Sequence, residues 1–582
     1  MKGTPEKGNV LGIDFGTTYT FVIKCTKDRM GELHPIGDNK LELYENTSKE
    51  GGDVIKYSNG IRTVIGYSDK KGWKIGGKAI EFDRENSGEM KICFNLKEKL
   101  LMIAKELPNV LDSKNNQPAT QKNQDDQEKL GYIDKRIREL EEIEERIDAW
   151  INKCIQEGKM EIKDLDEKYG YVFNVNGNDK FYNAIKLTKI FFNLLFNCDG
   201  VCTNEQDPME IKSKSSIFNL VDFHDVECIV IGAPAADMGT DDKATCYSEV
   251  ILQGILCYIA KNILGLEKIE GKDLLVIPEP QLAGKAFIAE KHIQELCDGE
   301  QLLVIDIGGG TTDFAVLAKD KGKYFAPIPA SGDIEIAGNR FDMELEDCVK
   351  KNYNTNGENF SNESVRTAKE QLFLTKSSTK IKYLVEVNKE KEEYRADKER
   401  STKDKIYNAY LKHGRRTEIK SKDGVRPYGV IWAEGHDEGI DNDSYNKENF
   451  KNLVNYYQEL FNDQADLLVE ELKKYVNMSE KVKKLKWKGL KVLFVGGSSR
   501  MKELCEELCE KGLGLNKVGN EEEGYRWYKC EGYQQCEIHC YFNEAWENEA
   551  SKLTCANMIA IGAVRFAQDQ LSTNTNNAIY SV

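Results

Sequence analysis

Three glycine-containing turns, far apart in the sequence, have residue types suited to binding phosphate. The apolar run Val10–Ile13 leads into the first turn, Asp14-Phe15-Gly16-Thr17-Thr18-Tyr19. A similar run, Leu302–Ile305, leads into Asp306-Ile307-Gly308-Gly309-Gly310-Thr311-Thr312-Asp313. Such turns can aim backbone N–H groups and hydroxyls at a phosphate, and a carboxylate at the end of a strand can hold a divalent cation. The two hairpins therefore predict a site for a phosphate and a cation.

The third turn suggests a place for a flat group. The apolar run Leu490–Val495 leads into Gly496-Gly497-Ser498-Ser499-Arg500. Glycine and serine leave room against the backbone, and an arginine guanidinium stacks well on planar rings. Each turn alone is a weak signal. Two similar hairpins followed by a Gly-Gly-Ser turn are much harder to obtain by chance.

Alternating apolar segments predict the strands and helices that must hold these turns. Strands are expected at Val10–Ile13, Thr20–Ile23, Glu227–Gly232, Leu274–Ile277, Leu302–Ile307, Asp313–Ala318 and Leu490–Val495. Helices are expected at Lys97–Leu107, Tyr132–Cys154, Ala184–Asn197, Tyr247–Leu264, Gln281–Glu290, Val365–Leu374, Phe450–Tyr475 and Ala556–Gln568. Between 385 and 450 the periodicity fades, which leaves a surface excursion and a small subdomain as alternatives.

The segment Tyr132–Cys154 is amphipathic, with apolar residues three and four apart and Glu144 interrupting them. One interpretation is that it packs on its own domain; the other is that it binds a partner.

Composition narrows the function classes. The net charge is −16 over 582 residues, which argues against a nucleic-acid binder. No apolar run approaches the roughly 18–20 residues of a membrane span, and the N-terminus has no apolar signal. Sixteen scattered cysteines then favour free thiols and a cytoplasmic location. Cys530, Cys536, His539 and Cys540 are close enough for zinc to be an alternative, although their spacing fits no common zinc module.

These motifs resemble those of the heat-shock protein 70 chaperone ATPases, within the actin-like ATPase superfamily. Gly12–Tyr19 and Asp306–Asp313 are similar to the two phosphate motifs, with Thr312 where the family usually has Phe, and Val495–Arg500 is similar to the adenosine motif. Four further segments support the chaperone branch: Phe94–Leu100, Ile229–Ala235, Leu275–Ala283 and Val365–Leu372. The resemblance runs from about Val10 to Gln568, with divergent stretches inside it.

The resemblance implies an α/β, two-lobed actin-like (ribonuclease H-like, duplicated) fold that binds ATP or ADP with magnesium between its lobes. It implies phosphate contacts from Gly16, Thr17, Thr18, Tyr19, Gly308, Gly309, Gly310 and Thr311. Adenosine contacts would come from Lys369, Gly496, Gly497, Ser498 and Arg500, and magnesium would be held by Asp14 and Asp306. Lys97, Glu279, Asp313 and Thr311 would be catalytic, with Lys99 as an alternative to Lys97.

The chain also departs from the family. Arg366 and Glu370 stand where the opposite charges are usual, which puts the base contacts in doubt. We expect a first lobe at 9–232 with a helical insertion at about 112–180, and a second lobe at 233–568 with an insertion at about 376–450. A polar tail at 569–582 would follow, without room for a peptide-binding domain.

The expected function is a slow, ATP-driven switch or chaperone-like regulator, with protein partners on the inserted segments. A filament-forming actin-like protein and a nucleotide-binding pseudo-ATPase are the alternatives, and a sugar kinase of the same fold is a more distant one. The segment Gly72–Ala79 nearly spells a Walker A loop but ends in Ala where Ser or Thr is needed, so a surface turn is expected there.

Overall fold

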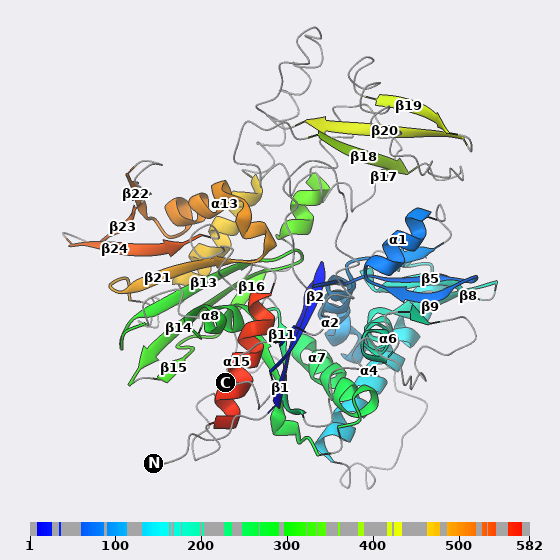
Figure 1. The fold of residues 1–582 in the computed structure, drawn as a ribbon, viewed down its shortest axis with the longest axis horizontal. Helices are drawn as coiled ribbons and strands as arrows, with labels where there is room; N and C mark the ends of the chain where they lie inside the picture. Colours follow the sequence, from blue (N-terminus) through cyan, green and yellow to red (C-terminus); the bar gives the residue numbers. More distant parts are fainter. Residues whose placement is uncertain are drawn as a thin grey trace.

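The protein is a mixed α/β structure with several sheets (Figure 1). The computed structural model describes residues 9–25, 34–35, 60–85, 90–112, 131–161, 165, 168–175, 177–197, 201–202, 226–235, 247–266, 268–289, 296–321, 323–333, 336–344, 359–360, 382–388, 416–421, 424–432, 463–477, 486–519, 526–531, 534–542 and 557–572. Within these residues, no helix combines the length and the apolar character needed to cross a bilayer.

The first large sheet carries the first phosphate-type turn. Strands β1 (Asn9–Phe15) and β2 (Tyr19–Cys25) form an antiparallel hairpin, so the turn joins them directly. On the other side of β1, the strands β11 (Val226–Ala233) and β12 (Leu274–Pro278) continue the sheet in parallel. Strands β3 (His34–Pro35) and β4 (Ile61–Arg62) pair with β2. All of β1 is buried, as expected for a central strand.

The second large sheet repeats this arrangement. Strands β13 (Gln301–Ile307) and β14 (Thr312–Asp320) form a hairpin, and β21 (Leu490–Val495) lies parallel to β13. The sheet continues through β24 (Gln534–Tyr541), β23 (Arg526–Glu531) and β22 (Asn516–Val518). At its other edge, β15 (Lys323–Phe325) and β16 (Ser331–Asp333) pair with β14.

Two helices fill the space between the sheets. Helix α8 (Glu279–Ala289) and helix α15 (Met558–Ser572) pack on each other, and one apolar core joins them to both sheets. Figure 1 shows α15 between β1 and the second sheet. The approach of α15 to β1 is close: a Cβ atom added at Gly12 would lie 2.5 Å from the carbonyl oxygen of Ala560. The two hairpins are therefore held in place by a shared core.

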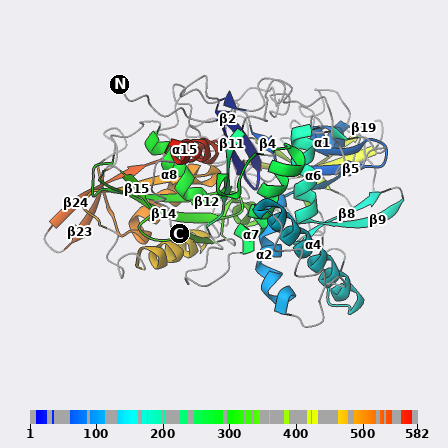
Figure 2. The same cartoon turned by 90° about the horizontal axis from the view of Figure 1, so that it is seen from below.

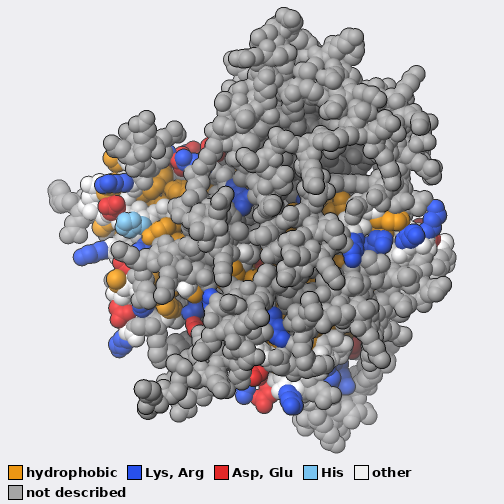
Figure 3. All heavy atoms as spheres, in the orientation of Figure 1, with side chains coloured by type: hydrophobic (Ala, Val, Ile, Leu, Met, Phe, Trp, Pro, Cys, Tyr) orange, Lys and Arg blue, Asp and Glu red, His pale blue; other side chains and the backbone are white. Residues whose placement is uncertain are grey.

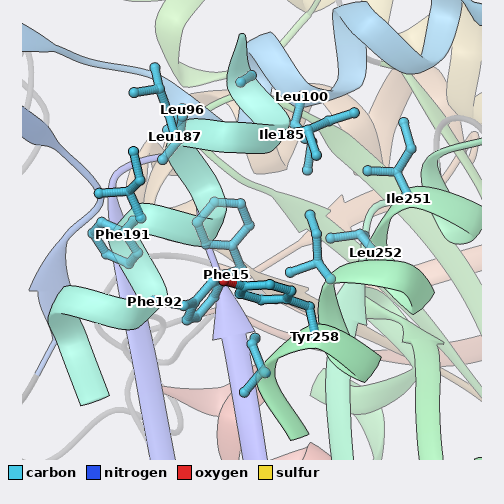
Figure 4. Close-up of a cluster of buried hydrophobic side chains, with 14 of the residues drawn as sticks. Phe15, Leu96, Leu100, Ile185, Leu187, Phe191, Phe192, Ile251, Leu252 and Tyr258 are labelled. Carbon is cyan, nitrogen blue, oxygen red and sulfur yellow. The ribbon is translucent and has the colours of Figure 1, made fainter. Parts of the chain in front are cut away.

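The other face of the first sheet is covered by α2 (Leu96–Asp112), α6 (Ala184–Asn197) and α7 (Tyr247–Tyr258), which continues as a π-helical turn, Ile259–Ile263. Figure 4 shows Phe15, at the end of β1, among side chains of these three helices. Its ring centroid lies 5.3 Å from that of Phe192 and 6.1 Å from that of Phe191. This aromatic cluster anchors the strand end next to Asp14.

Helix α4 (Tyr132–Gln156) belongs to the expected insertion at 112–180, together with the hairpin β8 (Gly170–Val175) and β9 (Asn178–Asn183). Its apolar stripe is buried against α7 and α2 (Figures 1 and 2), so it packs on its own domain, the first of the two interpretations. Ile143 lies beside Glu144 and completes the buried stripe where Glu144 interrupts the apolar pattern. Glu144 itself makes a largely buried ion pair with Lys189 of α6, with an Nζ–Oε2 distance of 2.5 Å.

Truncating this stripe should therefore destabilise the fold. We predict that Ile147→Ala lowers the free energy of unfolding by about 2–5 kcal/mol, because the side chain is completely buried and leaves a cavity. The matched control Glu145→Ala removes an exposed side chain of the same helix and should change it by less than about 0.5 kcal/mol. Denaturant unfolding followed by circular dichroism measures both. Equal, small effects would contradict the packing of α4 on its own domain.

A smaller sheet lies beside the first, formed by β5 (Ile65–Ser68), β6 (Gly72–Ile75), β7 (Lys91–Cys93) and β10 (Val201–Cys202), with helix α1 (Gly77–Glu85) following β6. The surface turn expected at Gly72–Ala79 is therefore wrong. Trp73 and Ile75 are buried in this sheet, where Trp73 packs on Phe173 at a centroid distance of 5.0 Å.

Within 376–450, the described residues form strands rather than a structureless excursion. Strands β18 (Lys382–Asn388), β19 (Arg416–Ser421) and β20 (Gly424–Trp432) pair with one another, and β17 (Asn359–Phe360) pairs with β18. Of the two alternatives for this region, the small subdomain fits these strands. The helix expected at Val365–Leu374 lies outside the described residues.

The expected boundary between the lobes at 232/233 remains a prediction, but the sheets divide later in the chain. Because β12 pairs with β11, residues up to 278 contribute strands to the first sheet, and the second sheet begins at 301. Residues 463–477 form a helix that, with α13 (Lys502–Glu507), covers the far face of the second sheet.

On the face shown in Figure 3, basic and acidic side chains of the described residues are interspersed.

Candidate functional site

The two hairpins close in the same way. In the first, the N–H of Gly16 donates to the carbonyl oxygen of Tyr19 at 3.1 Å, and in the second the N–H of Gly308 donates to that of Thr311 at 2.9 Å. In each, an aspartate lies two residues before this glycine, at the end of a buried strand. The similarity between Asp14–Tyr19 and Asp306–Thr311 therefore extends from sequence to hydrogen bonding.

The two turns face each other at close range. A Cβ atom added at Gly310 would lie 2.6 Å from Thr17 Oγ1, and one added at Gly309 would lie 3.0 Å from Thr18 Oγ1. These glycines therefore allow an approach that no side chain would permit. Hydroxyls and backbone amides from both sheets meet at one place, as a phosphate site requires.

This contact predicts the effect of one added methyl group. We expect Gly310→Ala to weaken ATP binding by about 10- to 100-fold, because the new Cβ must push the two turns apart. Calorimetric titration with Mg·ATP measures the effect. Gly131→Ala is a matched control, because a Cβ added at Gly131 meets nothing within 4 Å. Unchanged affinity in the Gly310 variant would argue against phosphate binding between the turns.

Asp14 and Asp306 each present an oxygen suited to a cation. Asp14 Oδ1 and Asp306 Oδ2 are buried and have no hydrogen-bond partner in the described part of the chain. Burial, followed by repulsion from Glu279, raises the pKa of both carboxyls well above its ordinary value, and Lys97 opposes this increase. A buried oxygen without a partner is costly, and a divalent cation would relieve that cost.

Magnesium fits this donor set. It keeps several waters and is usually bound by one or two carboxylates together with substrate phosphates. Among the described residues, no group of three or more His, Cys, Asp or Glu side chains is arranged to hold a metal ion alone. Two aspartates beside a phosphate site agree with magnesium held largely through water.

Lys97 lies at the start of helix α2 and pairs with Glu279, the first residue of α8. Both side chains are buried, and Lys97 Nζ donates a hydrogen bond to Glu279 Oε1. Burial lowers the pKa of Lys97, but Glu279, Asp14 and Asp313 outweigh it and raise that pKa overall. Lys97 is therefore a fixed positive charge among carboxylates. Lys99 is on the same helix, but the contact with Glu279 is made by Lys97.

Asp313 is held from two sides. Its Oδ1 accepts a hydrogen bond from the N–H of Ala235 at 2.7 Å, and its Oδ2 accepts one from Thr311 Oγ1 at 2.7 Å. Burial and the charge of Glu279 nevertheless raise the pKa of Asp313 to about 7. A carboxylate with such a pKa can exchange a proton near neutral pH, as a general base must.

The third turn sits against the second. Ser498 Oγ donates to the carbonyl oxygen of Gly308 at 3.1 Å. Gly496 has a φ of +84°, which favours glycine, whereas a Cβ added at Gly497 would meet nothing within 4 Å. The turn thus leaves open space beside Gly497. Arg500 is the last residue of the 3₁₀ turn Gly497–Arg500.

The structure brings most of the residues singled out from the sequence to one place, while their individual roles stay predictions. Lys369, Arg366 and Glu370 lie outside the described residues, so the expected contact with adenosine has no structural description. Sequence reasoning missed Gly338 and Asn339, whose N–H groups donate to Gly308 and Gly309 at 3.0 and 2.6 Å. A glycine just before a helical turn is the signal that could have found them.

Arg62 was also missed: its guanidinium lies 4.6 Å from the ring centroid of Tyr19. Cys530, Cys536, His539 and Cys540 lie within the described residues and are not arranged to hold a metal ion together. Cys509 Sγ and Cys540 Sγ are 3.8 Å apart, and Cys530 is exposed. Burial, with hydrogen bonding to Cys540, raises the pKa of Cys509 well above its ordinary value.

Comparison with known proteins agrees with this geometry. The family model "Hsp70 protein" matches residues 261–414. The "Chaperone protein DnaK" of Mycoplasmopsis agalactiae is 34% identical over 136 residues, which cover 23% of this chain and 19% of that protein. The "Stromal 70 kDa heat shock-related protein, chloroplastic" of Spinacia oleracea is 35% identical over 94 residues, 16% of this chain and 14% of that protein.

Other relatives are cell shape-determining proteins. The "Cell shape-determining protein Mbl" of Bacillus subtilis is 36% identical over 87 residues, 15% of this chain and 23% of that protein. The chain thus spans about a fifth of the length of the curated relatives it matches. These matches are partial. The residues matched by the family model include Glu279 and the turn Asp306–Asp313. The chain therefore contains a divergent Hsp70-family domain, of the actin-like ATPase superfamily.

Proposed function

We propose that this chain binds ATP with magnesium between two lobes of a duplicated, ribonuclease H-like actin fold, and hydrolyses it slowly. The observation that carries the proposal is the convergence of two phosphate-type turns on a pair of buried aspartates. Each of these aspartates has an oxygen without a hydrogen-bond partner in the described structure. Because members of the Hsp70 family are ATPases, the matched residues support the same chemistry here.

The residues of the site suit phosphoryl transfer, which needs positioning and charge neutralisation more than covalent chemistry. Thr17, Thr18 and the glycine turn would hold the β- and γ-phosphates, and Asp14 and Asp306 would hold magnesium. Magnesium would neutralise charge on the phosphate oxygens. The Lys97 ammonium would stabilise the charge that develops on the γ-phosphate.

The attacking water would be oriented by Glu279 and Asp313. Asp313 is fixed by Ala235 and Thr311, so it is pre-positioned rather than mobile. Its pKa of about 7 would let it accept a proton from the water near neutral pH. Glu279 would orient the water while paired with Lys97. The ion pair would therefore link the position of the water to the position of the lysine charge that stabilises the γ-phosphate.

The nucleotide state would then drive a conformational switch. Closure of two lobes around a ligand is a common route to such a switch. Chaperone-like regulation, a cytoplasmic location and protein partners on the inserted segments remain part of the proposal. Partners on α4 would have to use its polar face, because its apolar stripe is already buried within the chain.

Release of phosphate from ATP by the purified chain tests the proposal. Wild type should turn over slowly with magnesium, and Asp306→Ala and Lys97→Ala should abolish turnover, with ATP binding measured on the same samples. Tight binding without turnover in wild type would favour the pseudo-ATPase. Absence of binding would contradict the proposal.

A filament-forming actin-like protein is a second candidate, favoured by the similarity to the Mbl proteins over 15% of this chain. Sedimentation at high speed separates the two. A pellet that forms with ATP and disperses without it would favour the filament. A chain that stays in the supernatant at every nucleotide state would exclude it.

A further inference from the structure

One hydrogen bond joins the two halves of the site from residues far apart in the sequence. Asn339 Nδ2 donates to Glu98 Oε2 at 2.8 Å, and both residues are partly buried. Glu98 lies in the first turn of α2, beside the first sheet, whereas Asn339 follows β16 of the second sheet. The bond therefore connects elements that belong to different sheets.

The Asn339 end of this bond is tied directly to the second phosphate-type turn. The N–H of Asn339 donates to the carbonyl oxygen of Gly309 at 2.6 Å, and that of Gly338 donates to Gly308 at 3.0 Å. A movement of Asn339 would thus move the Gly308–Gly310 turn with it.

The Glu98 end is tied to the lysine. Glu98 is the residue after Lys97, and the helix that carries both begins after Asn95, whose φ of +54° lies in the left-handed region. Because the chain turns sharply at Asn95, the first turn of α2 can send Lys97 toward Glu279 while Glu98 reaches Asn339. One helical turn therefore contacts both sides of the site.

We propose that Glu98 and Asn339 are a positioning pair, which holds the Lys97-bearing turn at a fixed distance from the Gly308–Gly310 turn. This inference rests on the proposed ATP-binding function. With the pair intact, Lys97 stays aligned with the phosphate bound by the second turn, and the bound nucleotide leaves slowly. A hydrogen bond to a charged carboxylate is strong enough for this role, because such bonds are about twice as strong as neutral ones.

Reversal of the bond tests the proposal. Asn339→Asp places two carboxylates together, and it should slow hydrolysis of bound ATP and speed ATP release by about tenfold each. The double variant Glu98→Gln/Asn339→Asp restores a hydrogen bond with donor and acceptor exchanged, so it should recover most of the loss. Single-turnover hydrolysis and stopped-flow release of fluorescent ATP are the readouts.

Alanine variants and a control separate positioning from folding. Glu98→Ala and Asn339→Ala should each lose about as much as the pair together, because one interaction is removed in all three. Glu106→Ala breaks a comparable bond on the same helix, to Asn109 at 3.1 Å, and should leave both rates unchanged. Thermal melts identify any variant that fails to fold, and the remaining variants then decide the result.

Four outcomes overturn the inference. Wild-type rates in the single variants would show that the bond positions nothing. Additive losses in the alanine pair, or a double exchange no better than Asn339→Asp, would show that the two residues act separately. If wild type itself binds no ATP, the proposed function fails and the inference fails with it. If wild type binds and hydrolyses ATP while the variants match it, only the inference fails.

Discussion

Replacement of Lys97 by methionine is expected to lower ATP turnover by about 100- to 1000-fold while ATP still binds. Lys97 Nζ donates a hydrogen bond to Glu279 Oε1, and the lysine charge is stabilised by Glu279, Asp14 and Asp313. Its loss removes the positive charge that would meet the γ-phosphate, whereas the two glycine turns that would hold the nucleotide remain. Phosphate release and calorimetric titration measure the two effects.

The same variant has a second consequence, for stability. Without Lys97, the buried Glu279 carboxylate loses its ion pair, and such a loss typically costs about 3–5 kcal/mol. Lys97→Met/Glu279→Gln removes both charges, so it should recover stability without recovering turnover. Denaturant unfolding of the two variants separates damage to the fold from damage to catalysis. Turnover near the wild-type rate in either variant would contradict the role of Lys97.

Replacement of Asp306 by asparagine should stabilise the nucleotide-free protein and weaken magnesium-dependent ATP binding by about 10- to 100-fold. Asp306 lies among Glu279, Asp313 and Asp14, and burial together with their charges raises its pKa well above 3.8. A neutral side chain of the same shape removes that repulsion. It also removes the charge that would hold magnesium, so stability and binding should move in opposite directions.

The pH dependence of this effect has a definite sign. A carboxyl whose folded pKa exceeds its unfolded pKa binds its proton more tightly in the folded state. Its contribution to stability is present below the ordinary pKa of 3.8 and is lost as the pH rises toward the folded pKa. The gain in melting temperature of Asp306→Asn over wild type should therefore grow from about pH 5 to about pH 8. Surface carboxyls are already ionised in this interval, so they do not contribute to the change.

Differential scanning fluorimetry across this pH range, with and without Mg·ATP, tests both parts. Asp320→Asn is a matched control, because Asp320 is exposed at the far end of the same hairpin. It should change neither the pH dependence nor the stabilisation by Mg·ATP. A destabilised Asp306→Asn protein that still gains full stability from Mg·ATP would contradict the assignment.

The sequence predicted best those elements whose residues satisfy one strong local pattern. The helix Ala184–Asn197 and the strand Leu490–Val495 were predicted with the bounds that the structure gives, because each is apolar and ends at a clear turn. The glycines and aspartates in the turns at 14–19 and 306–313 indicated the site. Glycine allows the close approach of the two turns, and the aspartates are ligands suited to a cation.

What the sequence could not give depends on contacts between distant segments. Nothing local to Asn339 reveals that it meets Glu98, 241 residues earlier, and nothing local to Ala235 reveals its bond to Asp313. The segment Gly72–Ala79 resembles an incomplete Walker A loop, which suggested a surface turn. Its strand Gly72–Ile75 is instead buried through Trp73, which packs on aromatic partners about a hundred residues later in the sequence. Tertiary packing overrode the local signal in each case.

The most direct test of the account is a calorimetric titration of the whole chain with ATP, once with magnesium and once with magnesium removed by a chelator. We expect saturable binding at one site with magnesium, and much weaker binding without it, because the buried oxygens of Asp14 and Asp306 would then repel the phosphates. Binding of equal strength in both titrations, or no binding in either, would contradict a magnesium-nucleotide site between the two turns.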